Sequence, residues 1–179
     1  DTLLVVFSGA GAARFTEGSG QAGRVAPVIL PHDADLENLE ETAISTDELG
    51  EALSGTRAGR VLVVLDTAFG RQKTGRGAGS LVPGPEQSEV MMAALRDLSD
   101  RDGWALVVAC GPQGGAYSIG SRRRGLFSYY LLEALAGRAD LNADGQVSLS
   151  ELERWTAPLV ETYAGKEGLR QRPLFMFRR

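Results

Sequence analysis

Three short, uninterrupted apolar runs constrain the fold of this chain more than any other feature. They are Leu3–Phe7, Val61–Leu65 and Trp104–Ala109, and all three are rich in β-branched or bulky apolar residues. A strand with one face in water alternates apolar and polar residues, whereas a continuous run indicates a strand covered on both faces. Helical patterns lie between the runs, so the order predicts a three-layer α/β fold with a mostly parallel central sheet flanked by helices.

Helix starts are marked by two capping boxes, in which a serine precedes a glutamate by three residues. One is Ser45 with Glu48 and the other is Ser148 with Glu151. Two further segments carry apolar residues at helical spacing, and Gly137 ends one of them. The predicted helices are therefore 45–53, 88–99, 126–136 and 148 to about 163.

Three other segments have a weaker pattern. Val25–Leu30 is expected to form a hairpin or an edge strand, because Pro27 argues against a central position. Pro173–Phe177 is expected to be a closing strand. Residues 70–87 are rich in glycine and nearly free of apolar side chains, so we expect a long flexible loop there.

Size and charge exclude several classes of protein. The 179 residues fit one domain spanning 1–179, and the net charge of -4 gives no reason to bind nucleic acid. The single cysteine excludes an internal disulfide framework, and the apolar runs are too short to span a bilayer. We therefore expect a soluble, cytoplasmic protein that binds neither nucleic acid nor membranes.

Polar and small residues follow each predicted strand. The strand exits read Ser8-Gly9-Ala10-Gly11, Asp66-Thr67-Ala68 and Cys110-Gly111-Pro112-Gln113. Because the carboxyl ends of parallel strands meet at one edge of a sheet, we expect these segments to lie together. That edge is the candidate functional site.

These exits give the chain a resemblance to the caspase-like cysteine peptidases, above all to metacaspases and their bacterial relatives. In that family one strand runs into Ser-Gly-His-Gly and a later one into Asp-x-Cys-x-x-Gly, so Ala10 stands at the histidine position and Ala68 at the cysteine position. Further matches are Leu30-Pro31-His32-Asp33, Gly125-Leu126-Phe127-Ser128 and Gln171-x-Pro173. The resemblance implies a caspase-like fold, with further strands expected upstream of Asp1.

The two alanines imply that the chain is catalytically inactive as written. A methyl group neither attacks a carbonyl nor moves a proton, so a natural pseudopeptidase and a deliberately inactivated peptidase are both compatible with the sequence. His32 and Cys110 are the only residues of their kinds. We interpret His32 as a surface residue and Cys110 as a core thiol, rather than as a replacement dyad.

Asp66 is the residue that bears on specificity. By the resemblance it lines the pocket for a basic side chain, with Cys110 as a second residue beside it, so the expected partner is a peptide or protein carrying Arg or Lys. The alternative is an aspartate that caps a turn through backbone amides.

Asp140–Glu151 matches the calcium-binding loop of an EF-hand. Asp140, Asn142, Asp144, Ser148 and Glu151 supply oxygen ligands, Gln146 supplies its backbone carbonyl, and Gly145 permits the sharp bend. Calcium is therefore a candidate cofactor, and no organic cofactor is expected. The alternative is plain helix punctuation, because Ser148 and Glu151 also form a capping box.

A dinucleotide-binding domain is a competing hypothesis. Gly9 and Gly11 follow a predicted strand, as the glycine fingerprint of that fold requires. The third glycine position holds Arg14, and residues 16–23 lack the helical period that the fingerprint needs. The fingerprint is therefore incomplete.

Overall fold

The computed structural model describes residues 1–16, 24–69, 85–119 and 124–178. Its central sheet has the order β1-β5-β6-β9, in which β1, β5 and β6 are parallel and β9 runs antiparallel to β6. This confirms a mixed α/β fold with a mostly parallel central sheet. The strands are β1 (Thr2–Ser8), β2 (Gly11–Thr16), β3 (Arg24–Ile29), β4 (Ile44–Ser45), β5 (Arg60–Asp66), β6 (Trp104–Val108), β7 (Ser118–Ile119), β8 (Arg124–Gly125) and β9 (Leu174–Phe177).

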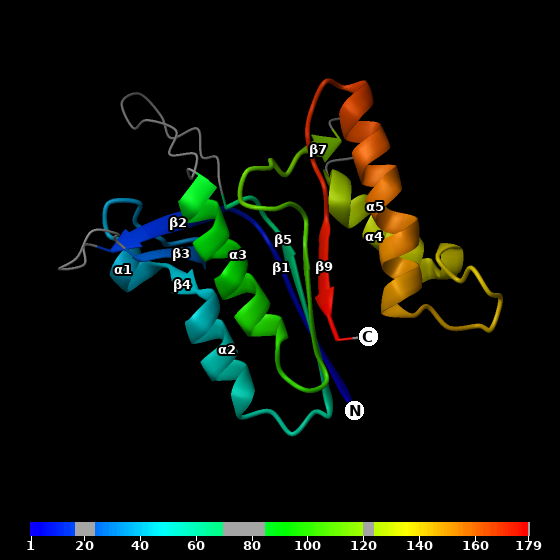
Figure 1. Cartoon of the computed structure of the whole chain (residues 1–179), viewed down its shortest axis with the longest axis horizontal. Coiled ribbons are helices and arrows are strands. Elements are labelled where there is room, and N and C mark those ends of the chain that lie inside the picture. The colour runs from blue at the N-terminus through cyan, green and yellow to red at the C-terminus, as the bar shows by residue number, and fades with distance from the viewer. Residues whose placement is uncertain (17–23, 70–84, 120–123, 179) are drawn as a thin grey trace.

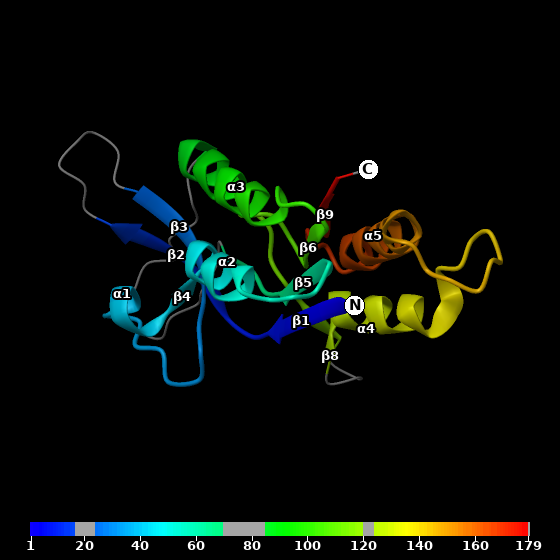
Figure 2. The same cartoon turned by 90° about the horizontal axis from the view of Figure 1, so that it is seen from below.

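Helices cover both faces of the central sheet, with α2 and α3 on one side and α4 and α5 on the other (Figures 1 and 2). Within the described ranges, no helix has both the length and the apolar character needed to cross a membrane. The helices are α1 (Leu39–Thr42), α2 (Thr46–Ser54), α3 (Pro85–Ser99), α4 (Leu126–Glu133), the π-helical turn η1 (Ala134–Arg138) and α5 (Leu149–Lys166).

The continuous apolar character of β5 follows from this layering. Val61, Val63 and Leu65 pack on the α2 and α3 side, whereas Leu62 and Val64 pack on the α4 and α5 side. Successive side chains of a strand point to opposite faces, so a strand between two helical layers needs apolar residues at every position. The sequence pattern of β5 was therefore interpreted correctly.

A second, antiparallel sheet of β2, β3 and β4 follows β1. It confirms the expected hairpin at Val25–Leu30, but β3 is the middle strand of three, so the expectation that Pro27 excludes a central position is wrong. Pro27 is tolerated because β4 pairs only with Val28 and Ile29. At Pro27 itself the β4 side of the strand is unpaired, so no ladder hydrogen bond is lost there.

Both capping boxes are present, since Ser45 caps α2 and Ser148 caps α5.

The prediction of a flexible loop over 70–87 is wrong for its last residues, because α3 already begins at Pro85. Proline suits the first position of a helix, where its fixed φ is favourable and its missing N–H has no partner to lose. The rest of that segment, 70–84, lies outside the described residues.

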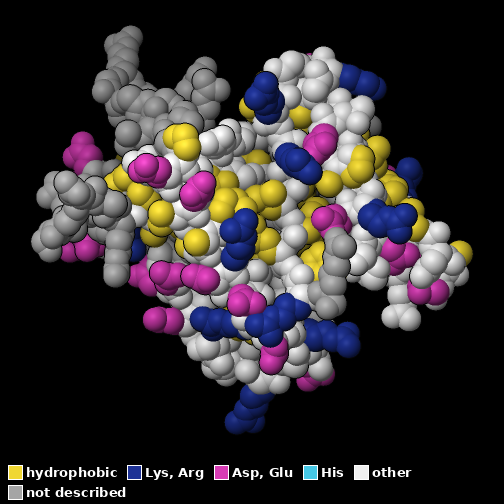
Figure 3. Space-filling model, in the orientation of Figure 1, with side chains coloured by type: hydrophobic (Ala, Val, Ile, Leu, Met, Phe, Trp, Pro, Cys, Tyr) yellow, Lys and Arg dark blue, Asp and Glu magenta, His cyan; other side chains and the backbone are white. Residues whose placement is uncertain are grey.

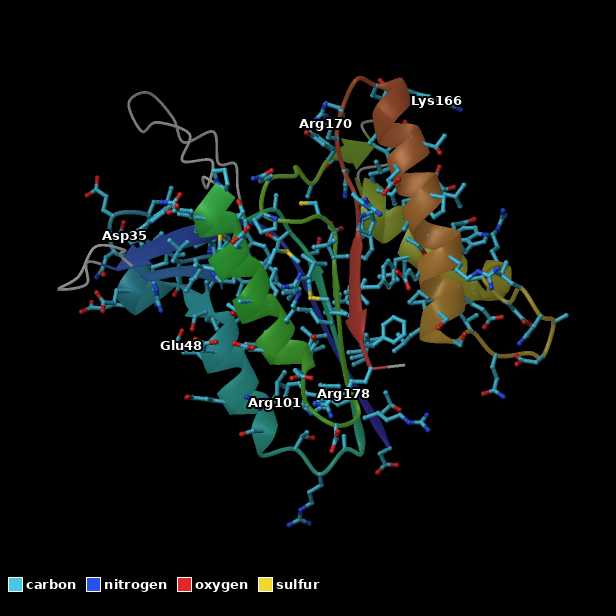
Figure 4. All side chains as sticks on the ribbon, in the orientation of Figure 1. Asp35, Glu48, Arg101, Lys166, Arg170 and Arg178 are labelled. Carbon is cyan, nitrogen blue, oxygen red and sulfur yellow. The ribbon has the colours of Figure 1, made fainter. Side chains whose placement is uncertain are left out.

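Two arginines hold the turn that leads into β6 at the amino end of the sheet (Figure 4). The Arg101 guanidinium lies 4.8 Å from the centre of the Trp104 ring and donates a hydrogen bond to the Gly50 carbonyl at 2.8 Å. Arg178 forms ion pairs with Asp100 and Asp102. These contacts tie the end of the chain to the α3–β6 turn.

Candidate active site

The pairing of β1 with β5 brings the two alanine-bearing exits to the same edge of the sheet. Ser8 is the register partner of Asp66, and the Gly9 N–H donates to the Asp66 carbonyl at 3.3 Å. A Cβ placed on Gly11 would lie 3.2 Å from the Ala68 carbonyl oxygen. Ala10 is exposed and Ala68 is partly buried. The structure therefore brings these two segments together, as the sequence predicted.

Ala10 borders a cavity of about 520 Å³. The Leu30 N–H donates to the Ala10 carbonyl at 2.9 Å, which joins the exit of β1 to the segment after β3. The cavity is lined by Phe7, Ser8, Gly9, Ala10, Leu30, Pro31, His32, Ala34 and Leu36. His32 thus lies at the surface beside Ala10, while Cys110 does not line this cavity, which agrees with the interpretation that the two form no dyad.

Asp66 is buried, with 6% of its surface exposed. The Ser128 hydroxyl donates a hydrogen bond to Asp66 Oδ2. Burial raises the pKa of the Asp66 carboxyl, against the hydrogen bonds from Ser128, which lower it. Asp66 is therefore engaged with the start of α4.

Cys110 is fully buried at the end of β6. Its Sγ lies 3.6 Å from the Thr67 carbonyl oxygen, and burial, together with the charge of Asp66, raises the pKa of the thiol to about 12. Because the thiolate is the nucleophilic form, Cys110 is chemically quiet at neutral pH. Cys110 lies near Asp66, as expected, but its side chain is not accessible from solvent.

A second cavity, of about 750 Å³, lies at the carboxyl end of β6. Residues 111–114 line it, together with Arg170, Arg172 and Glu161. Arg170 stands near the top of Figure 4, and the surface in Figure 3 carries acidic and basic side chains side by side. Arg172 and Glu161 form an ion pair at 3.0 Å, so Arg170 contributes the remaining charge of this lining.

The acidic loop lies at the opposite edge of the sheet. With Thr2, Arg60 and Trp104, which belong to the amino ends of β1, β5 and β6, it lines a cavity of about 850 Å³. Whatever the loop binds is therefore remote from the edge that carries Ala10 and Ala68.

The carboxylates of this loop are turned toward its own backbone. Asp140 accepts hydrogen bonds from the N–H groups of Asp144 at 3.1 Å and Gly145 at 2.9 Å. Glu151 accepts from the N–H groups of Leu141 at 3.2 Å and Ser148 at 2.9 Å. In the described part of the chain, no three His, Cys, Asp or Glu side chains are gathered as metal ligands. Asp140 and Glu151 thus hold the loop in its present conformation through its own backbone.

Three residues that tie the site together were not singled out from the sequence. Ser128 and Gly125 contact Asp66. Gln171 donates to the Ala109 carbonyl at 3.3 Å and accepts from the Tyr117 N–H at 3.1 Å, so it links the end of β6 to the next loop. All three lie within motifs of the family resemblance, which was the one available signal of their importance.

The glycine fingerprint does not lead into a helix. Gly11 is the first residue of β2, a strand that turns back through β3. A dinucleotide site of the expected kind needs a helix amino terminus directly after the glycines, where N–H groups meet the pyrophosphate. The dinucleotide hypothesis therefore loses its structural basis.

In comparisons with models of known protein families and with curated proteins, the chain matches none of them. Its function therefore has to be inferred from the chemistry of its own residues.

Proposed function

We propose that the chain is a caspase-like peptidase domain that is inactive because Ala10 and Ala68 occupy the positions of the catalytic histidine and cysteine. The observation that carries this proposal is the parallel pairing of β1 and β5, with Ser8 opposite Asp66. It puts the two alanine segments side by side at the carboxyl edge, where a thiol and an imidazole would have to meet.

The proposal accounts for the chemistry that the site lacks. Peptide hydrolysis by this mechanism needs a thiolate nucleophile and an imidazole that protonates the leaving amine. Neither alanine provides such a group, and the native thiol of Cys110 is buried and protonated. The chain as written is therefore expected to bind peptides or proteins without cleaving them.

Restoring the dyad tests this proposal. We expect Ala10→His with Ala68→Cys to cleave reporter peptides after Arg or Lys, while either single substitution leaves the chain inactive. A Cys110→Ala background removes the native thiol from the assay. A folded double variant that cleaves after Asp instead, or a single variant with equal activity, would contradict the assignment.

Thiol reactivity gives a second readout that needs no intact substrate cleft. A neighbouring imidazolium lowers the pKa of a thiol, so the thiol introduced at position 68 should react with iodoacetamide at a lower pH when Ala10→His is present. Identical pH profiles with and without Ala10→His would show that positions 10 and 68 do not form a dyad.

Basic specificity is proposed from Asp66, which precedes Ala68 by two residues on the same strand exit. A carboxylate shielded from water selects a guanidinium or ammonium group, and it repels an acidic side chain. In the restored enzyme, Asp66→Ala should abolish cleavage after Arg without creating cleavage after Asp. Undiminished cleavage after Arg would remove Asp66 from the pocket.

A second proposal is that Asp140–Glu151 binds calcium. Two features favour it: the positive φ angles of Ala143 (60°) and Gly145 (81°), which bend the loop sharply, and the Glu151 carboxylate, which meets the Leu141 N–H across the loop. Asp140, Asn142, Asp144, Ser148, Glu151 and the Gln146 carbonyl would then hold the ion.

The test is the change in melting temperature on adding millimolar calcium. A ligand bound only by the folded state raises it, and Asp140→Ala with Glu151→Gln should abolish the rise. Since Glu151→Gln also removes a capping box, the matched control is Glu48→Gln, which removes the other box and leaves the loop intact. No shift in the unmodified chain would leave only the capping role.

A further inference from the structure

Helix α4 begins without a cap of its own. Its N-cap residue is Gly125, which has no side chain and gives no cap hydrogen bond, whereas α2 and α5 each begin at a serine that accepts one. The first N–H groups of a helix have no partner inside the helix. The Leu126 N–H donates to the Tyr117 carbonyl at 2.7 Å, so the N–H groups that follow it are the ones that need an acceptor.

The missing acceptor comes from a different element. The carboxylate of Asp66, the last residue of β5, accepts a hydrogen bond from the Ser128 hydroxyl, and the backbone of Ser128 also lowers the pKa of this carboxyl. Ser128 is the third residue of α4, and the N–H at this position is the one that an N-cap side chain normally satisfies. A carboxylate also suits the positive end of the helix dipole.

Gly125 makes room for this carboxylate. A Cβ placed on Gly125 would lie 2.4 Å from Asp66 Oδ2, far inside van der Waals contact. The Gly125 backbone angles, φ -58° and ψ 142°, are open to any residue, so the requirement for glycine is one of space. The N-cap side chain of α4 has in effect been replaced by the side chain of Asp66.

We propose that Asp66 is the N-terminal cap of α4, and that this contact is an autoinhibitory latch on the basic-side-chain pocket. A guanidinium can use the buried carboxylate only if Ser128 gives up its hydrogen bond and the start of α4 moves away. The latch rests on the proposed function, whereas the cap does not.

The capping role of Asp66 is tested by removing its carboxylate and supplying a local cap at position 125 instead. Asp66→Ala should lower the melting temperature by about 2–4 °C, the usual effect of a lost cap in a chain of this size. Asp66→Asn, which retains an acceptor oxygen, should lower it less. Gly125→Ser should destabilise the unmodified chain by its clash with Asp66, yet in the Asp66→Ala background it should restore the melting temperature, because serine then caps α4 locally.

Only capping by Asp66 predicts that Gly125→Ser lowers the melting temperature of the unmodified chain but raises that of the Asp66→Ala variant. If Gly125→Ser lowers the melting temperature equally in both backgrounds, Asp66 is not the cap. Hydrogen exchange at the Ser128 amide gives the local readout: it should speed up in Asp66→Ala and slow again when Gly125→Ser is added. An unchanged rate in Asp66→Ala would also overturn the cap.

The latch is tested with N-acetyl-arginine methylamide, followed by NMR titration. Ser128→Ala removes the competing hydroxyl and should tighten binding about tenfold, as expected for one hydrogen bond to a charged group. Ser128→Thr, which keeps the hydroxyl, is the matched control and should bind like the unmodified chain.

Equal affinity of the unmodified chain and Ser128→Ala would overturn the latch. If neither binds the probe, the latch fails together with the pocket assignment of Asp66. In both cases the melting temperatures decide the cap independently, so failure of the peptidase proposal and failure of the cap give different results.

Discussion

At the residue scale, the environment of each ionisable side chain decides what it can do. Cys110 is the only cysteine of the chain, yet it is fully buried and its pKa is raised to about 12. Asp66, nearby, is also buried and adds to this shift. A thiol and a carboxyl are both potentially reactive groups. Because both are buried here, Cys110 and Asp66 have structural roles in this conformation.

We expect Cys110 to resist alkylation in the folded chain. With iodoacetamide at pH 8, the thiol should react only as fast as the protein opens. Little of the thiol is ionised at this pH, and the reagent cannot reach the buried Sγ. Mass spectrometry with and without denaturant measures the difference. Rapid labelling under native conditions would show that the end of β6 is exposed.

The two capping-box glutamates make the free energy of unfolding depend on pH in the acidic range. Hydrogen bonds from Ser45 lower the pKa of Glu48, and hydrogen bonds from Ser148 lower the pKa of Glu151, both from an ordinary value of 4.5. A carboxyl with a lowered folded-state pKa stabilises the fold above its unfolded value and loses that contribution as pH falls. Asp66, whose pKa is raised, acts in the opposite direction.

The urea midpoint of the chain should therefore fall between about pH 5 and pH 3, and it should fall less in the double variant Glu48→Gln with Glu151→Gln. Glu51→Gln, at an exposed position of α2, is the control with the same change of charge. If the double variant keeps the full acid sensitivity, other carboxyl groups dominate it.

At the element scale, the end of α4 shows how one backbone angle shapes a helix. The helix passes into the π-helical turn η1, where Gly137 has a φ of 102°. The predicted helix 126–136 is too long as an α-helix, because α4 ends at Glu133, but regular helical geometry does break at Gly137, as predicted. Only glycine adopts such an angle without steric cost, so the residue terminates the helix by its backbone.

Two glycine substitutions should accordingly have opposite effects. A Cβ meets no atom within 4 Å at either Gly137 or Gly165, so packing does not distinguish them. Gly137→Ala forces an alanine to a positive φ and should cost about 1–2 kcal/mol. Gly165→Ala, inside α5, should stabilise by about 0.4–1 kcal/mol. Chemical denaturation measures both, and the same sign for both would contradict this reading of Gly137.

At the scale of the whole molecule, the central sheet is covered unevenly. In the part of the chain that the structure describes, β1 pairs only with β5. Its side chains Leu3, Val5 and Phe7 pack toward α2 and α3, whereas Leu4 and Val6 are 52% and 59% exposed. The α4 and α5 layer therefore leaves this part of the sheet open to solvent.

The open face should bind a hydrophobic dye. We expect Leu4→Thr with Val6→Thr to lower ANS fluorescence while leaving the melting temperature within about 2 °C, because threonine suits a strand and little buried area is lost. Val63→Thr, which places a hydroxyl in the core, is the contrasting variant and should destabilise strongly. Unchanged dye binding in the double variant would mean that the dye binds elsewhere.

Features that depend on short-range patterns could be predicted from the sequence. Continuous apolar runs predicted the central strands, the Ser-x-x-Glu boxes predicted the starts of α2 and α5, and Gly137 predicted the break in helical geometry within η1. Each is a property of a few neighbouring residues, so no knowledge of the fold is needed to find it.

Only the tertiary structure decided which distant residues meet. Asp66 and Ser128 are separated by 62 positions, and nothing near either of them shows that a carboxylate at a strand end caps a helix that begins elsewhere. The same holds for Pro27, which a middle strand tolerates because its neighbour β4 stops short of it. Contacts of this kind arise when strand register and helix packing are set by the whole core, and local patterns carry no record of them.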